Sequence, residues 1–255
     1  MRDAFVNALI ETAEADKRVW LLTGDLGFKV LETFAEKFSD RFVNAGVAEQ
    51  NMTGIATGMA LEGKIVFTYS IANFATLRCL EQIRNDAAYH EVNLTVVASG
   101  GGFTYGGLGM SHHATEDISI MRSLPGVKVV APCTAWETYE ATESLSKDEG
   151  VSYLRIEKGG IQDPPSPDTK FQVGKAIRMT SGKDLTLMST GGIINECLKA
   201  EEILREQGIG EEILFSSVYQ EIINNFENIK IEADKRLVSV FSRSFQSDIF
   251  VEDGY

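Results

Sequence analysis

Cysteine is scarce in this chain, and long apolar runs are absent from it. Its three cysteines, Cys79, Cys133 and Cys197, are widely spaced, so the sequence predicts neither a disulfide framework nor a zinc site. The longest apolar runs, such as residues 94–98, suit a buried strand and are far too short to cross a bilayer. Residues 1–10 continue into an acidic helical pattern and lack the features of a signal peptide. We therefore expect a cytoplasmic protein.

Positive charge is also scarce. The 24 lysines and arginines face 37 aspartates and glutamates, which gives a formal net charge of -13, and no basic run occurs. Such a chain repels phosphate backbones and anionic lipid, which argues against nucleic-acid or membrane binding as the main role. A local pocket for a small anionic ligand remains compatible with this charge. The hydrophobic content of 44% is ample for a packed core at this length.

Short apolar runs alternate with helical patterns in the first part of the chain. Strands are expected at residues 19–23, near 42, and at 65–69, 94–98, 127–131 and 152–156. Helices are expected between them at residues 4–16, 30–38, 47–61, 75–88, 116–122 and 135–146. Buried strands separated by helices predict an α/β fold with a parallel sheet, complete by about residue 160.

A proline-rich segment follows this first domain. Residues 162–167 hold three of the five prolines, which disfavours helix and central strand and predicts a linker over residues 161–172. A second β-α-β pattern then appears, with a strand at 185–189, a helix at 193–206 and a strand at 213–217. The sequence therefore predicts a second, smaller α/β domain over residues 173–255.

Two glycine-rich turns resemble phosphate-binding motifs, but neither has the full sequence of such a motif. Gly24-Asp25 and the later Asn51 have the spacing by which thiamine enzymes hold magnesium, but Leu26 stands where that motif needs a glycine. The loop over residues 100–109 lacks the Lys-Ser/Thr ending of a P-loop and the spacing of a dinucleotide fingerprint. We expect no metal ligands in this chain. The loop does follow a strand, at the edge where open α/β sheets bind ligands.

One carboxylate and one pair of histidines are candidates for chemistry. Glu49 begins an apolar, small-residue helix with no basic residue nearby in the sequence. Burial would favour its protonated form, whereas the helix dipole would favour the anion by only ~0.3–1 kcal/mol; an exposed, capping glutamate is the alternative. His112 and His113 end the glycine-rich loop, where a structural role and a proton-transfer role are equally open.

Three separated blocks resemble the carboxyl-terminal half of a transketolase. They are Asn44 to Ala60, Tyr69 to Asp86 and Gly109 to Asp117. More specifically, they resemble the smaller subunit of a split, two-gene transketolase. Deoxyxylulose-phosphate synthase and the β subunit of 2-oxoacid dehydrogenases are more distant relatives. The resemblance covers about residues 1 to 218 and implies a pyrimidine-binding domain of a thiamine diphosphate enzyme over residues 1–160, followed by the family's carboxyl-terminal domain.

The resemblance also implies roles for single residues. Glu49 would hydrogen-bond the N1′ atom of the cofactor's aminopyrimidine, which favours the tautomer that removes the thiazolium C2 proton. His112 would face the substrate's hydroxyl or carbonyl as a general acid and base. Phe74 and Arg78 fall where related enzymes line the pyrimidine pocket, although Phe74 equally suits the core and Arg78, among apolar neighbours, needs a partner. Asp25 matches an acid near the cofactor and the dimer contact.

The chain departs from the family pattern at several places. Leu108 stands where other transketolases place an aspartate that recognises the donor's hydroxyl, and residues 100–102 lack a basic residue used for sugar phosphate. Lys158 aligns with an arginine that binds substrate phosphate in relatives, and a lysine can still pair with phosphate as a point charge. After Ser217 the sequence leaves the family pattern, which predicts a shortened second domain.

The resemblance implies a subunit of a thiamine diphosphate-dependent transketolase, which transfers a two-carbon ketol unit from a ketose (phosphate) to an aldose. Because the magnesium motif is missing, Mg²⁺ and the diphosphate are expected on an N-terminal transketolase subunit. The expected assembly is a heterotetramer with paired pyrimidine domains, and the chain alone should be inactive. Two alternatives stay open. One is a carboligase related to deoxyxylulose-phosphate synthase, which uses pyruvate and releases carbon dioxide, and the other is a non-catalytic interaction subunit.

Overall fold

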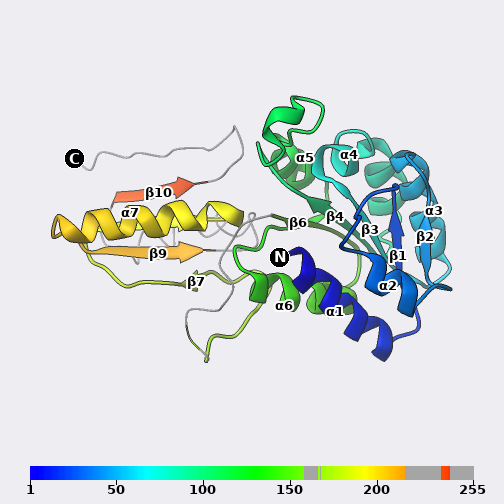
Figure 1. Ribbon diagram of the computed structural model, residues 1–255, viewed down its shortest axis with the longest axis horizontal. Helices are drawn as coiled ribbons and strands as arrows, with labels where there is room; N and C mark the ends of the chain where they lie inside the picture. The colour runs from blue at the N-terminus through cyan, green and yellow to red at the C-terminus, as the bar shows by residue number, and fades with distance from the viewer. Residues whose placement is uncertain (158–165, 167, 216–236, 242–255) are drawn as a thin grey trace.

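Two β-sheets organise the chain, each with helices packed against it (Figure 1). The computed structural model describes residues 1–157, 166, 168–215 and 237–241. The first sheet is six-stranded and parallel throughout, in the order β2-β1-β3-β4-β6-β5. Its strands are β1 (Val19–Thr23), β2 (Phe42–Asn44), β3 (Ile65–Ile71), β4 (Leu94–Ser99), β5 (Lys128–Val130) and β6 (Val151–Ile156). The predicted parallel α/β fold is thus confirmed.

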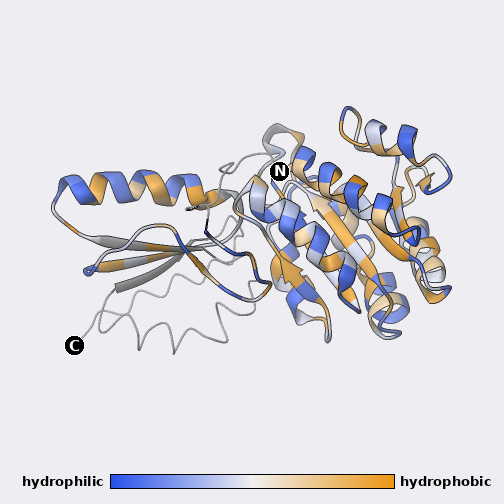
Figure 2. Cartoon of the chain, turned by 90° about the horizontal axis from the view of Figure 1, so that it is seen from below, coloured by the Kyte–Doolittle hydropathy of each residue, from blue (hydrophilic) through white to orange (hydrophobic). Residues whose placement is uncertain are grey.

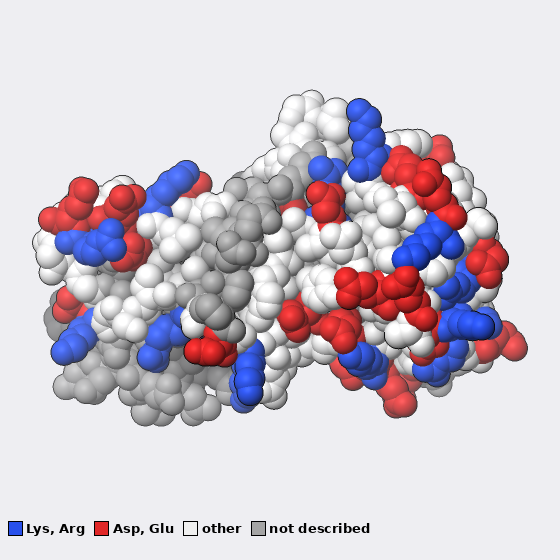
Figure 3. Space-filling view, turned by 60° about the horizontal axis from the view of Figure 1, so that its bottom comes forward, with Lys and Arg blue, Asp and Glu red and all other residues white. Residues whose placement is uncertain are grey.

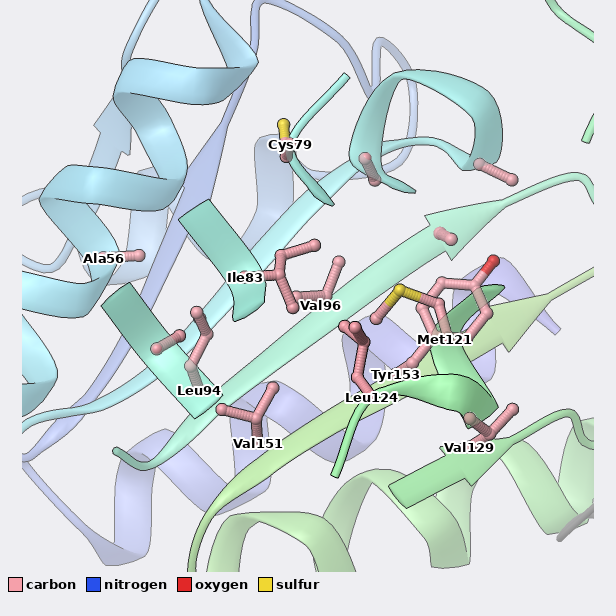
Figure 4. Close-up of a cluster of buried hydrophobic side chains, with 14 of the residues drawn as sticks. Ala56, Cys79, Ile83, Leu94, Val96, Met121, Leu124, Val129, Val151 and Tyr153 are labelled. Atoms are coloured by element: carbon pink, nitrogen blue, oxygen red, sulfur yellow. The ribbon is translucent and has the colours of Figure 1, made fainter. Parts of the chain in front are cut away.

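Helices cover both faces of this sheet and make three layers. They are α1 (Arg2–Ala15), α2 (Glu32–Lys37), α3 (Glu49–Leu61), α4 (Ala72–Thr76), α5 (Asp117–Ser123) and α6 (Ala135–Lys147). One core cluster joins α1, α2 and α6 to the sheet, with Phe5 and Phe34 among its fully buried side chains. The other joins α3, α4 and α5 to the opposite face, and Figure 4 shows part of it around Ile83, Val96 and Met121.

The central strands are buried on both faces. Every residue of β3 and of β4 is buried. A parallel strand covered by helices on both sides needs a continuous apolar run, which explains why these segments show little alternation. Figure 2 shows the strands of this sheet as orange ribbons between helices whose outer faces are blue.

The segment predicted as one helix over residues 75–88 is two elements. Helix α4 ends at Thr76, a turn follows, and a π-helix, η1, spans Gln82–Ala88. The turn is closed by the backbone N–H of Cys79, which donates to Thr76 O at 3.1 Å. Apolar spacing alone does not distinguish such a break from a continuous helix, because the wider π-turn shifts the pattern by a single residue.

The second sheet is four-stranded, in the order β10-β8-β9-β7. Its elements are β7 (Ile177–Arg178), β8 (Leu185–Ser189), η3 (Gly191–Ile193), α7 (Ile194–Glu206), β9 (Glu211–Phe215) and β10 (Leu237–Phe241). It touches the first unit through Gly191, whose N–H donates to Ala131 O at 3.0 Å, and through a cluster that includes Cys133 and Leu187.

Two strands of the second sheet were not predicted. β7 has two residues and is antiparallel to β9, too short for a periodic signal. β10 lies beyond Ser217 and pairs with β8, so the sheet continues past the point where the sequence is expected to leave the family pattern. The remaining residues after 217, and half of the predicted linker, lie outside the described residues. Within the described ranges, no helix is both long and apolar enough to cross a membrane.

Candidate active site

The candidate site residues all follow the carboxyl ends of strands in the first sheet. Asp25 follows β1, Glu49 follows β2, Phe74 and Arg78 follow β3, and His112 follows β4. Because the carboxyl ends of parallel strands meet at one edge, the fold directs these residues to a common region. Lys158, the remaining candidate, lies outside the described residues.

Glu49 is buried at the first turn of α3. Its relative exposure is 1%, so the predicted burial of this acid is confirmed. Gly24 packs closely against the Glu49 side chain: a Cβ atom added to Gly24 would lie only 3.2 Å from Glu49 Cγ. The carboxylate oxygen Oε1 is buried and has no hydrogen-bond partner among the described residues. A buried acceptor without a hydrogen bond lowers the stability of the fold by about 1–3 kcal/mol, so a ligand that donates a hydrogen bond to this oxygen would be favoured.

Arg78 supplies the partner of the other carboxylate oxygen. Its Nη1 donates to Glu49 Oε2 at 2.6 Å, which gives Arg78 the partner that its apolar neighbours predicted. The sequence shows no basic residue near Glu49 along the chain, and the fold brings this one from the segment after β3. The Arg78 guanidinium also lies over the Phe74 ring, with Cζ 4.4 Å from the centroid. A charge-assisted hydrogen bond and a cation–π contact together fix its position.

His112 lies beside Phe74. The ring centroids are 5.0 Å apart at an interplanar angle of 61°, an edge-on arrangement. Ser111 Oγ lies 3.0 Å from His112 Nδ1, and the Tyr105 ring centroid is 6.0 Å away. Because Nδ1 is engaged, Nε2 is the ring nitrogen that remains for a ligand within the described part of the chain. His113 instead places its Nε2 2.9 Å from Gly106 O, so it holds the loop.

Asp25 is held in an unusual backbone conformation by Asn44. Its φ of 59° lies in the left-handed region that few non-glycine residues adopt. Asn44 Oδ1 accepts from the Asp25 N–H at 3.0 Å, and Asn44 Nδ2 donates to Asp25 Oδ1 at 2.9 Å. Asn44 Oδ1 also accepts from the Gly46 N–H, so Asn44 connects the turn after β1 to the turn before Glu49.

Sequence reasoning missed the supporting roles of Asn44, Ser111 and Tyr105. Asn44 ends β2 in the sequence, at the position where an amide can bond two turns. Ser111 precedes His112, and its backbone O accepts from Asn73 Nδ2 at 2.5 Å, which links the His112 loop to α4. The contacts of Asn44 with Asp25 and of Ser111 with Asn73 have no sequence signature, because each joins segments that follow different strands.

An apolar rim lies on the loop that carries His112. Phe103, Leu108 and Met110 are exposed, the last by 87%. The sequence from residue 100 to 115 contains no charged side chain. The predicted departure at Leu108 therefore lies on the surface, where it is accessible to a ligand or to another chain.

Residues 1–163 match the transketolase pyrimidine binding domain, which is more than half of the 255 residues. The chain belongs to the transketolase family. A Methanocaldococcus jannaschii protein named as a transketolase C-terminal section is 39% identical over 217 residues, 84% of this chain and 69% of that protein. One of the subunits of an apulose-4-phosphate transketolase from Phocaeicola vulgatus is 34% identical over 247 residues, 95% of this chain and 78% of that one.

A solved structure of a split transketolase is also similar to this transketolase-family chain. It is described as a split gene transketolase in an inactive β4 tetramer, and it is 30% identical with a TM-score of 0.81. The alignment covers 94% of this chain and 78% of that one. The predicted resemblance to the C-terminal subunits of split transketolases is confirmed, and the chain is a transketolase-family subunit of the split type.

Proposed function

We propose that this chain is the pyrimidine-binding subunit of a cytoplasmic, thiamine diphosphate-dependent transketolase, which transfers a two-carbon ketol unit from a ketose to an aldose. The observation that carries the proposal is the state of Glu49. This carboxylate is buried, is held at Oε2 by Arg78, and has no partner at Oε1 among the described residues. A buried acceptor held in one orientation suits a ligand that brings its own donor.

The family's cofactor fits this site. The protonated N1′ atom of its aminopyrimidine is a donor of the kind that Glu49 Oε1 lacks, and Phe74 offers an aromatic side chain nearby. Bound thiamine diphosphate supplies a carbon nucleophile. Glu49 holds the proton at N1′, and Arg78 keeps the carboxylate aimed by its 2.6 Å hydrogen bond. His112 Nε2 exchanges a proton with the substrate's hydroxyl or carbonyl oxygen.

A second subunit would hold the diphosphate and Mg²⁺. Leu26 interrupts the magnesium motif after Asp25, which supports placing those ligands on an N-terminal transketolase subunit. Apolar side chains beside the site support a covering chain, because Val47, two residues before Glu49, and Leu77, next to Arg78, are exposed. The expected assembly is a heterotetramer with paired pyrimidine domains, and Asp25 lies near that contact. The solved relative is described as an inactive β4 tetramer, which favours dependence on the partner.

The substrate would be a small sugar. Leu108 and the uncharged loop argue for a pair of sugars different from that of other transketolases, and Lys158 would pair with a substrate phosphate. The Phocaeicola relative is named for apulose-4-phosphate and a Clostridium relative for 6-deoxy-6-sulfo-D-fructose, so the names of related subunits cover more than one sugar. The net charge of -13 opposes nucleic acid and anionic membranes as partners. On the face that Figure 3 shows, acidic and basic side chains are interspersed, and no purely basic patch appears there among the described residues.

The test is reconstitution with a diphosphate-binding subunit of a split transketolase. Titration calorimetry would measure thiamine diphosphate binding in the presence of Mg²⁺, and a labelled aldose with a ketose phosphate donor would report ketol transfer. We expect transfer without carbon dioxide release, and only when both subunits are present. Carbon dioxide release from pyruvate would instead identify a carboligase. A stable complex that binds cofactor but turns over neither donor would identify a non-catalytic subunit.

A further inference from the structure

A cluster of fully buried charged side chains lies beneath the glycine-rich loop. Asp117, Arg155 and Glu157 are each at most 2% exposed. The chemistry proposed above uses none of them. Burying a charged group costs several kcal/mol, and an apolar replacement is often as stable, so such a cluster is poor evidence for a purely stabilising role.

Arg155 lies between the two carboxylates. Its Nε is 3.2 Å from Asp117 Oδ2, and its Nη2 is 3.5 Å from Glu157 Oε1. Tyr153 Oη donates to the same Asp117 oxygen at 2.6 Å. Tyr153 and Arg155 come from β6, which pairs with a strand on each side, and Glu157 directly follows β6. Asp117 is the first residue of α5, directly after the loop that carries His112.

The other end of that loop is attached to Glu157. Thr104 Oγ1 donates to Glu157 Oε2 at 2.9 Å, and the same hydroxyl lies 2.7 Å from Gly101 O. Thr104 is near the start of the loop, and Asp117 directly follows it. The cluster therefore contacts both ends of one segment, and Arg155 joins the two contacts.

The base of the loop is closed over the guanidinium. Gly101 leaves no room for a side chain, since a Cβ atom there would lie 1.6 Å from Arg155 Nε. Next to it, Gly102 and Ala114 exchange two backbone hydrogen bonds, of 2.7 and 3.0 Å. The residues between them, including His112, form the exposed part of the loop.

We infer that Asp117, Arg155 and Glu157 form a buried clamp that closes the loop between Gly102 and Ala114 and thereby positions His112. The three are positioning residues, because their contacts reach His112 only through the loop. The clamp also faces the second sheet. A Cβ atom on Gly192 would lie 3.2 Å from Glu157 Cβ, so the segment before α7 packs against the clamp.

Hydrogen exchange tests the clamp without reference to activity. Thr104→Val removes the hydroxyl that reaches Glu157 and keeps the side-chain shape, whereas Thr104→Ser keeps the hydroxyl. The matched control is Thr142→Val on α6, where the buried Thr142 hydroxyl donates to Thr138 O at 2.7 Å. In the full chain, we expect T104V to speed amide exchange over residues 100–117 about 10–100-fold. This is the change in exchange rate that follows from losing the free energy of one hydrogen bond to a charged group. T104S and T142V should leave that segment unchanged, and unchanged exchange in T104V would overturn the clamp.

Turnover tests the positioning of His112, and this part alone rests on the proposed function. In the complex with the diphosphate-binding subunit, T104V should lower kcat about 10–100-fold, as a displaced catalytic group does. The thiamine diphosphate Kd should stay within twofold of wild type, since Glu49 and Arg78 are untouched, and T104S should restore kcat. The positioning of His112 by the clamp would be refuted if T104V sped amide exchange in the loop but left kcat normal. It would also be refuted if T142V lowered kcat as much as T104V does. A wild-type complex without ketol transfer would refute the proposed function, while the exchange result would still decide the clamp.

Discussion

Glu49 and Arg78, which the chain separates by 29 positions, are joined by a hydrogen bond of 2.6 Å. The pair is asymmetric, because the glutamate is 1% exposed and the arginine side chain is 44% exposed. Arg78 engages only Oε2, which fixes the carboxylate and leaves Oε1 directed elsewhere. This arrangement is the one that the proposed contact of Glu49 with the cofactor requires.

Glu49→Gln should separate activity from folding. Glutamine has the same shape, and its amide oxygen can still accept from Arg78, so we expect a thermal midpoint close to that of the wild type. Proton transfer at the ligand requires the acid, so kcat of the reconstituted complex should fall about 10²–10⁴-fold. Circular dichroism and the ketol-transfer assay measure the two effects, and an active variant would refute the role of Glu49.

Arg78→Met should destabilise the fold through Glu49. It leaves a buried carboxylate without its cation, for which we expect a loss of about 1–2 kcal/mol, at the lower end for buried pairs because Arg78 is half exposed. Adding Glu49→Gln should recover most of that loss, since no buried charge remains. Urea unfolding of both single variants and the double variant gives the coupling energy. A coupling near zero would mean that the 2.6 Å contact does not hold the carboxylate in solution.

The sequence predicts Glu49 well and its partner poorly. The small-residue helix after β2 leaves open whether the acid at its start is buried or is an exposed cap, and the resemblance to transketolases favours burial. The helix α3 begins at that residue, and its side chain is buried. Arg78 lies in the turn between α4 and the π-helix. Because apolar spacing predicts a single helix over this segment, the sequence does not predict the contact of Arg78 with Glu49. The order of strands is likewise set by tertiary packing, so the sequence alone does not bring Arg155 to Asp117.

Gly101→Ala should disrupt the clamp, whereas Gly107→Ala should be tolerated. A Cβ atom on Gly101 would overlap Arg155, and overpacking of this kind costs about 1–3 kcal/mol. A Cβ atom on Gly107, in the same loop, meets nothing within 4 Å. We expect G101A to lower the free energy of unfolding and G107A to change it by less than about 0.5 kcal/mol. Equal effects in urea titrations would argue that the loop does not rest on the guanidinium.

Cys79 should make stability fall at alkaline pH. Burial raises the pKa of its thiol from 9.0 to about 11. Between these values the thiol ionises in the unfolded chain but not in the folded one, so the folded state binds more protons and the free energy of unfolding falls as pH rises. The loss attributable to Cys79 is at most about 3 kcal/mol and is complete above pH 11. Cys79→Ala should show a shallower decline between about pH 8 and 11 than wild type, and parallel declines would contradict the assignment.

Val47→Asp should weaken assembly without unfolding the chain. Val47 is 76% exposed beside Glu49, where we propose that another chain covers the site. A charge placed there would have to be desolvated on association, whereas in the free chain it stays in water and should change stability by less than about 0.5 kcal/mol. Ile203→Asp on α7 is the control, because Ile203 is also exposed but lies on the second unit. Sedimentation velocity of the mixed subunits should show dissociation for V47D and intact complex for I203D, and the activity of V47D should recover as the concentration of the partner subunit rises. If V47D assembles as tightly as wild type, the surface beside Glu49 is not the contact.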